Sequence, residues 1–216
     1  MTLSTMKYPA NIQEFMIWFK NQSELYFKEL ELQQNVFGLQ HQKNTRWRDG
    51  LTDSEILNFQ NEVGFDFPTS LISYYKKMNG TNVPGVNIFG NQGIEYLYEP
   101  IFFSYPDHIH DIKYLINNLL NIQDLTIEKM KENKIPFIFP ISSFYFMIID
   151  NKTNPIYFLS SANKNHSINE PCVYGSLWTD TLQNFLVKNT FFQFDHISDL
   201  EEFPNIIRES NYWDTL

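Results

Sequence analysis

Apolar residues near the start of the chain recur with the period of an α-helix. They share one helical face, at Ile12, Phe15, Met16 and Phe19. The pattern continues less regularly to Leu30, so residues 10–35 are expected to form one long helix, or two joined ones, lying on a neighbouring element. The polar stretch from Gly38 to Gly50 is interpreted as a connector. Within it, Trp47 is expected to be packed and the arginines on either side of it solvated.

The next stretch carries the clearest helix signals in the chain. Thr52 or Asp53 can cap a first helix, and with Thr52 as the cap Glu55 completes a capping box. Gly64 falls where a left-handed residue ends that helix, and Pro68 suits the first turn of the next one. The pair Asn79-Gly80, which tolerates positive φ, is expected to stop the second helix. The predicted buried positions are Ile56, Phe59 and Val63 in the first helix, and Leu71, Ile72, Tyr75 and Met78 in the second.

Beyond these helices the apolar period shortens to that of β-strands. Val86–Phe89 and Ile94–Tyr98 are predicted strands. The second alternates between two faces, one with Ile94, Tyr96 and Tyr98 and the other with Glu95, Leu97 and Glu99. Phe137–Phe139 is a further predicted strand. Phe144–Ile149 and Ile156–Leu159 are joined by a turn rich in Asp, Asn and Pro, which predicts a β-hairpin.

The remaining elements are mostly helical. Asp111 is expected to cap a helix, and a shorter helix is expected around Ile127–Lys131. A helix containing Leu182, Phe185 and Leu186 is expected to be capped near Ser176 or Thr179. A last helical segment is predicted to contain Phe203, Ile206 and Ile207. One core is predicted to hold Phe59, Leu71, Ile72 and Tyr75 together with Phe185 and Leu186.

Composition narrows the class of protein. The chain has 216 residues, of which 43% are hydrophobic and 17% aromatic, enough for a sizeable core. No apolar run approaches the roughly 18 residues that predict a membrane span, and no charged-then-apolar leader opens the chain. Cys172 stands alone, so no disulfide can form within the chain. We therefore expect a cytoplasmic protein.

The formal net charge is −9 and is concentrated near the end of the chain. Residues 195–216 hold six acidic residues against Arg208 alone. An acidic surface repels nucleic acid and favours a basic protein partner. The alternative is that the charge only keeps the protein soluble.

The reactive residue types do not converge on a catalytic or metal-binding pattern. His108-Ile109-His110 would place two imidazoles on one side of a strand, but no third ligand stands at a suitable spacing. Glu95 and Glu99 would share a strand face like a catalytic carboxylate pair. Alternating Glu residues are common on exposed strand faces, however, so this spacing does not indicate acid–base chemistry. We therefore predict no enzymatic activity, no cofactor and no metal.

The helix–break–helix pattern also carries a family resemblance. The residues concerned are Leu51, Glu55, Ile56, Phe59, Glu62, Gly64, Phe67, Pro68, Leu71, Tyr75, Asn79 and Gly80, with a later match in "LWTDTLQNFL", Leu177–Leu186. Together they resemble the SUKH superfamily, which includes fungal cell-wall assembly regulators and many bacterial immunity proteins. Two departures are Phe67, where Leu is usual, and the compressed turn within "ISSFYFMIID".

The resemblance implies an α+β fold, with a twisted, largely antiparallel β-sheet and helices packed beside it. The SUKH-like domain would cover residues 45–190. An N-terminal helical extension over residues 1–44 and an acidic C-terminal helical tail over residues 191–216 would flank it and form one compact unit with the domain.

The resemblance implies a protein-binding role, in one of two forms. The first is an immunity protein that neutralises a toxin. Its expected partner is a basic toxin domain, such as a nuclease, and the protein itself would be a monomer or weak homodimer. The second is a constitutive adaptor of a multi-protein assembly. From charge and aromatic content, the expected partner-binding residues are Glu95, Tyr98, Glu99, Asp199, Glu201 and Glu202.

Overall fold

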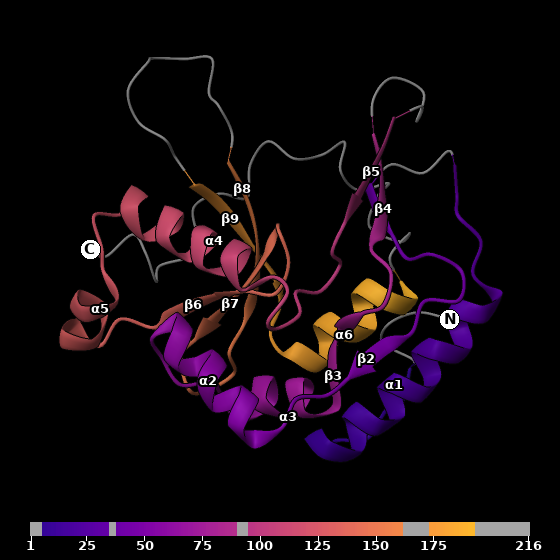
Figure 1. Cartoon of the computed structure of the whole chain (residues 1–216), viewed down its shortest axis with the longest axis horizontal. Helices are drawn as coiled ribbons and strands as arrows, with labels where there is room; N and C mark the ends of the chain where they lie inside the picture. The colour runs from indigo at the N-terminus through magenta and orange to yellow at the C-terminus, as the bar shows by residue number, and fades with distance from the viewer. Residues whose placement is uncertain (1–5, 35–37, 90–94, 162–172, 193–216) are drawn as a thin grey trace.

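The computed structural model describes residues 6–34, 38–89, 95–161 and 173–192, and these form helices and antiparallel strands (Figure 1). The helices are α1 (Ile12–Glu29), α2 (Asp53–Val63), α3 (Thr69–Lys77), α4 (Ile109–Ile122), α5 (Ile127–Asn133) and α6 (Leu182–Phe191). The strands are β1 (Gly38–Gln40), β2 (Trp47–Asp49), β3 (Met78–Thr81), β4 (Gly85–Phe89), β5 (Glu95–Glu99), β6 (Phe137–Pro140), β7 (Tyr145–Ile149), β8 (Ile156–Ser161) and β9 (Val173–Thr179). In the described segments, no helix combines the length and the hydropathy needed to cross a bilayer.

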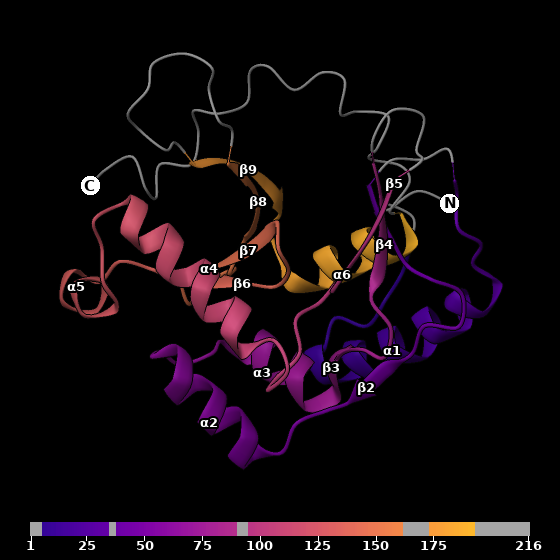
Figure 2. The same ribbon diagram turned by 45° about the horizontal axis from the view of Figure 1, so that its top comes forward.

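The described strands form three antiparallel sheets. Their orders are β1-β4-β5, β2-β3 and β6-β7-β8-β9. Helix α4 packs Leu115 and Leu119 on one face of the four-stranded sheet, while α6 lies on the other face (Figures 1 and 2). The predicted α+β class with antiparallel pairing is confirmed, although the strands are divided among three sheets rather than joined in one.

The helix signals between residues 52 and 64 are confirmed. The Thr52 side chain accepts a hydrogen bond from the Glu55 N–H, while the Glu55 carboxylate accepts one from the Thr52 N–H at 2.8 Å. Gly64 ends α2 with φ at 89°, in the left-handed region. Pro68 lies one position outside α3, at its N-cap.

Helix α3 ends before Asn79-Gly80, but these two residues lie inside β3 rather than in a turn. The Asn79 side-chain amide donates to the Tyr105 carbonyl at 2.6 Å and accepts from the Tyr105 N–H at 2.8 Å. Only Gly80 has a positive φ, at 72°, and a Cβ there would lie 2.9 Å from the Ser104 Cβ. The pair therefore allows β3 to pass close to residues 102–105.

The expected connector from Gly38 to Gly50 instead contributes two strands, β1 and β2. Trp47 is buried as predicted, and its indole N–H donates to the Ser23 hydroxyl at 2.7 Å. The prediction that Arg48 is merely solvated is wrong. Its guanidinium donates to the Thr81 carbonyl at 3.0 Å and also pairs with Asp107.

Two predicted helix starts are also wrong. Helix α4 begins at Ile109 with His108 at the N-cap, so Asp111 lies in its first turn. The pair His108 and His110 therefore stands at a helix start, not on a strand. At the other end of the chain, β9 extends through Thr179, and α6 is capped by Thr181 rather than by Ser176 or Thr179.

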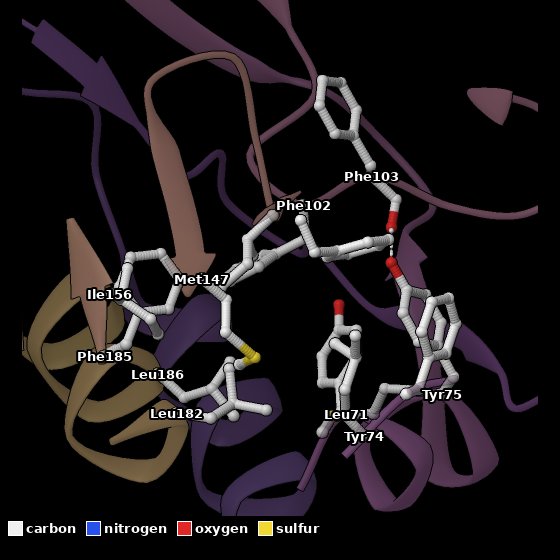
Figure 3. Packing of buried hydrophobic residues seen from close by; sticks show 14 of the residues in the cluster. Leu71, Tyr74, Tyr75, Phe102, Phe103, Met147, Ile156, Leu182, Phe185 and Leu186 are labelled. Atoms are coloured by element: carbon white, nitrogen blue, oxygen red, sulfur yellow. Dashed lines mark hydrogen bonds between the residues drawn. The ribbon is translucent and has the colours of Figure 1, made fainter. Parts of the chain in front are cut away.

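The predicted core is confirmed. Phe59, Leu71, Tyr75, Phe185 and Leu186 belong to one cluster of buried residues, with Ile72 packed against it. In Figure 3 the side chains of α3 and α6 approach the same interior, and the Tyr75 hydroxyl donates to the Phe103 carbonyl at 3.3 Å. Buried residues of α1 join this cluster, since α1 packs beside α3 and α6.

Candidate protein-binding surface

Strand β5 is the outer strand of the three-stranded sheet. It pairs with β4 in antiparallel register, from Gly85 opposite Glu99 to Phe89 opposite Glu95. No other described strand pairs with β5. In both views β4 and β5 project together, away from α2 and α3 (Figures 1 and 2). Among the described residues, one long side of β5 therefore has no strand beside it.

One face of β5 carries two tyrosines. Tyr96 and Tyr98 lie opposite Ile88 and Val86, respectively, and both of those β4 residues are buried. The two tyrosines themselves are accessible to solvent, since Tyr96 is exposed and Tyr98 is 63% exposed. An aromatic side chain that remains this accessible is a suitable anchor for a partner.

The opposite face of β5 combines carboxylates with an apolar residue. Leu97, 48% exposed, lies between Glu95 and Glu99 on this face. Phe89 of β4 is exposed directly opposite Glu95, and the Asn87 side-chain amide lies 3.4 Å from the Glu99 carboxylate. An apolar centre with charged ends resembles the centre and rim of a protein interface.

We call Phe89, Glu95, Tyr96, Leu97, Tyr98 and Glu99 the β5 surface. The structure brings the expected Glu95, Tyr98 and Glu99 onto one strand, with Tyr98 on the face opposite the two carboxylates. Phe89, Tyr96 and Leu97 were missed as binding candidates. The signal for Tyr96 and Leu97 was the run Tyr96-Leu97-Tyr98, which places large apolar groups on both faces of one strand. Asp199, Glu201 and Glu202 lie outside the described residues.

Strand β9 is a second sheet edge and also carries an exposed side chain, Leu177. Here, however, the strand is held by α6. The Trp178 indole N–H donates to the Asn189 side chain at 2.9 Å, and the Lys188 ammonium lies 3.7 Å from the Trp178 ring centroid. Among the described side chains of β9, Leu177 is the only exposed large hydrophobic one, whereas β5 exposes a contiguous set.

A polar cluster near the start of α4 was not anticipated from the sequence. His108 Nδ1 accepts from the Ser104 N–H at 2.9 Å and lies 2.9 Å from the Ser104 hydroxyl. Arg48 reaches the same hydroxyl at 3.4 Å and pairs with Asp107. Burial is the main cause that lowers the pKa of His108 below its ordinary value.

This cluster resembles a serine–histidine pair, but its geometry is structural. Ser104 is fully buried, so its hydroxyl faces the protein interior. The contacts tie β2 to the beginning of α4 and favour a neutral His108 that accepts at Nδ1. In the part of the chain that the structure describes, no three potential metal-ligating side chains come together.

Comparison with protein families identifies a matching family model. The family model SUKH_6, described as SMI1-KNR4 cell-wall, matches residues 53–172, which is more than half of the chain. The chain belongs to the SUKH family. A search of curated proteins found no match.

The SUKH match begins at the first residue of α2 and takes in β5. The β5 surface therefore lies within the family segment. Helices α1 and α6 lie outside it, as does the later resemblance at Leu177–Leu186.

Proposed function

We propose that this SUKH protein is a non-enzymatic binding module, and specifically an immunity protein that binds and neutralises a toxin in the cytoplasm. The observation that carries the proposal is the β5 surface. It places large exposed apolar side chains and two carboxylates on a sheet edge that no other described strand covers, inside the family segment. Neighbouring exposed apolar residues are typical of surfaces that bind another protein.

Charge supports a basic partner. The formal net charge of −9 attracts a positively charged protein over long range, and Glu95 and Glu99 place negative charge at the proposed contact. Toxins that act on nucleic acids carry basic surfaces, since they bind phosphate. We therefore propose a basic toxin domain, such as a nuclease, as the partner, with no cofactor and no nucleic acid bound by the chain itself.

A constitutive adaptor is the alternative. The matched family description refers to the cell wall, which fits a protein that holds an assembly together and neutralises nothing. An adaptor would use the same exposed edge, so surface geometry does not separate the two functions. Inhibition of a toxin does separate them.

The test is co-expression with the toxin domain encoded by a neighbouring gene. We expect the protein to restore growth and to elute with the toxin as a stable one-to-one complex in size-exclusion chromatography. Absence of both rescue and complex would refute the immunity role. A complex that forms without restoring growth would favour the adaptor.

A further inference from the structure

We infer that β5 binds its partner by strand addition and selects an extended segment with two basic residues four positions apart and apolar residues between them. This inference rests on the proposed protein-binding function and specifies the chemistry of the bound segment.

The backbone of β5 is the first feature that supports strand addition. Strand β5 hydrogen-bonds to β4, and no other described strand covers its outer side. About half of the backbone N–H and C=O groups of such an edge strand point away from the sheet. An extended segment of another protein can satisfy them by becoming the next strand. The open edge of β5 is thus a template for a chain in β conformation.

The charge on one face of β5 is the second feature. Glu95 and Glu99 share one face of β5 and are four residues apart, which spans roughly 13 Å at about 3.3 Å per residue. In an added strand, the residues opposite them are also four positions apart. Opposite charges at directly paired positions stabilise a sheet, so Lys or Arg is favoured at both.

The residues between the two carboxylates are the third feature. An added strand would place one side chain beside Leu97 and two beside Tyr96 and Tyr98, because successive side chains alternate between faces. All three of these β5 residues are exposed and apolar or aromatic. Apolar or aromatic residues at the three central positions therefore fit best.

A second copy of this chain fits less well. In a two-fold antiparallel pairing centred on Leu97, Glu95 would lie opposite Glu99 of the second copy, and this would occur twice. Like charges directly opposite one another destabilise a sheet. Shifting the register would shorten the overlap of a strand that has only five residues. The charges thus favour a basic partner over self-association.

The probe for this inference is a fluorescein-labelled peptide, Thr-Lys-Tyr-Val-Tyr-Lys-Thr. Binding to the full-length protein is measured by fluorescence anisotropy. We expect affinity at least about tenfold higher than for the same peptide with Glu in place of both Lys residues. The variant Glu95→Lys/Glu99→Lys should reverse this preference. The control Glu128→Lys/Glu132→Lys changes the net charge equally on the exposed face of α5, far from β5 in both views, and should keep it (Figures 1 and 2).

Strand addition itself is tested by N-methylation of the Lys peptide. Two peptides are compared, methylated at alternate residues in the two complementary patterns. Only one of the two patterns removes the backbone N–H groups that would face β5. Only the peptide with that pattern should therefore fail to bind. Hydrogen exchange of the β5 amides should slow when the unmethylated peptide is bound.

Several results would overturn the inference. They are equal binding of both methylated peptides, unchanged preference in the Glu95→Lys/Glu99→Lys variant, or a wild-type dimer whose formation protects the β5 amides. Full rescue from the toxin by the charge-reversed variant would also reject β5 while leaving the immunity role intact. Failure of wild-type rescue with the peptide results as expected would reject the immunity role alone.

Discussion

At the scale of single residues, Tyr98 on β5 and Tyr114 on α4 have the same exposed fraction, 63%. They differ in surroundings, since Tyr98 is next to exposed Leu97 and on the same strand face as exposed Tyr96. We predict that Tyr98→Ala speeds dissociation of the toxin complex by about tenfold or more, because aromatic anchors carry much of the binding energy. Tyr114→Ala is the matched control and should not change the dissociation rate. Surface plasmon resonance measures both, and equal rates for the two variants would exclude Tyr98 as an anchor.

His41 is a buried residue with a consequence for stability. Its ring is tilted by 33° against the Phe27 ring, with the centroids 4.5 Å apart, and burial lowers its pKa from 6.5 to about 3. A backbone hydrogen bond with Asn189 acts in the opposite direction but does not cancel this effect. The folded protein therefore holds His41 neutral where the unfolded chain would protonate it.

The lowered pKa of His41 makes the folded protein less stable in acid. Below a pH of about 6.5 the unfolded state binds a proton that the folded state does not, so stability falls as the pH falls towards 3. We predict that the free energy of unfolding in urea decreases by up to about 1.4 kcal/mol per pH unit from this group. His41→Phe should flatten the slope, whereas His110→Gln, at an exposed position, should not. An unchanged slope in His41→Phe would show that His41 does not cause it.

At the scale of elements, α2 depends on local contacts within its first turn. The Thr52 hydroxyl and the Glu55 carboxylate cap each other's backbone N–H groups. We predict that Thr52→Ala lowers the free energy of unfolding by about 1 kcal/mol, and that Thr52→Ser restores most of it. Ser54→Ala, at an exposed position in the same turn, is the control. Equal losses for Thr52→Ala and Ser54→Ala in denaturant unfolding would contradict the capping role.

At the scale of the whole molecule, one core joins elements that are distant in sequence. Leu71 on α3 is 1% exposed and belongs to the same cluster as Phe185 on α6. We predict that Leu71→Ala destabilises the protein by about 2–5 kcal/mol through a cavity. Leu57→Ala on α2, where the side chain is 56% exposed, should cost less than about 0.5 kcal/mol. Similar losses in chemical denaturation would contradict the shared core.

The sequence by itself determined the features that depend on nearby residues. The limits of α2, the left-handed Gly64 and the hairpin of β7 and β8 follow from capping and turn residues that act over a few positions. The same local signals, between Leu51 and Gly80, carried the family resemblance. The amphipathic patterns of α1 and α3 also identified part of the core, because a helix must bury its apolar face.

Tertiary structure alone decided the features that depend on distant partners. Strands β1 and β2 are too short to show a period, and Arg48 of β2 is held by Asp107, fifty-nine residues away. The end of β9 was confused with the start of α6, since Leu177 and Trp178 suit either element until pairing with β8 is known. For β5, the alternating pattern predicted a strand but not its exposure. Whether a strand is covered depends on which elements pack beside it, and no local sequence pattern encodes that neighbourhood.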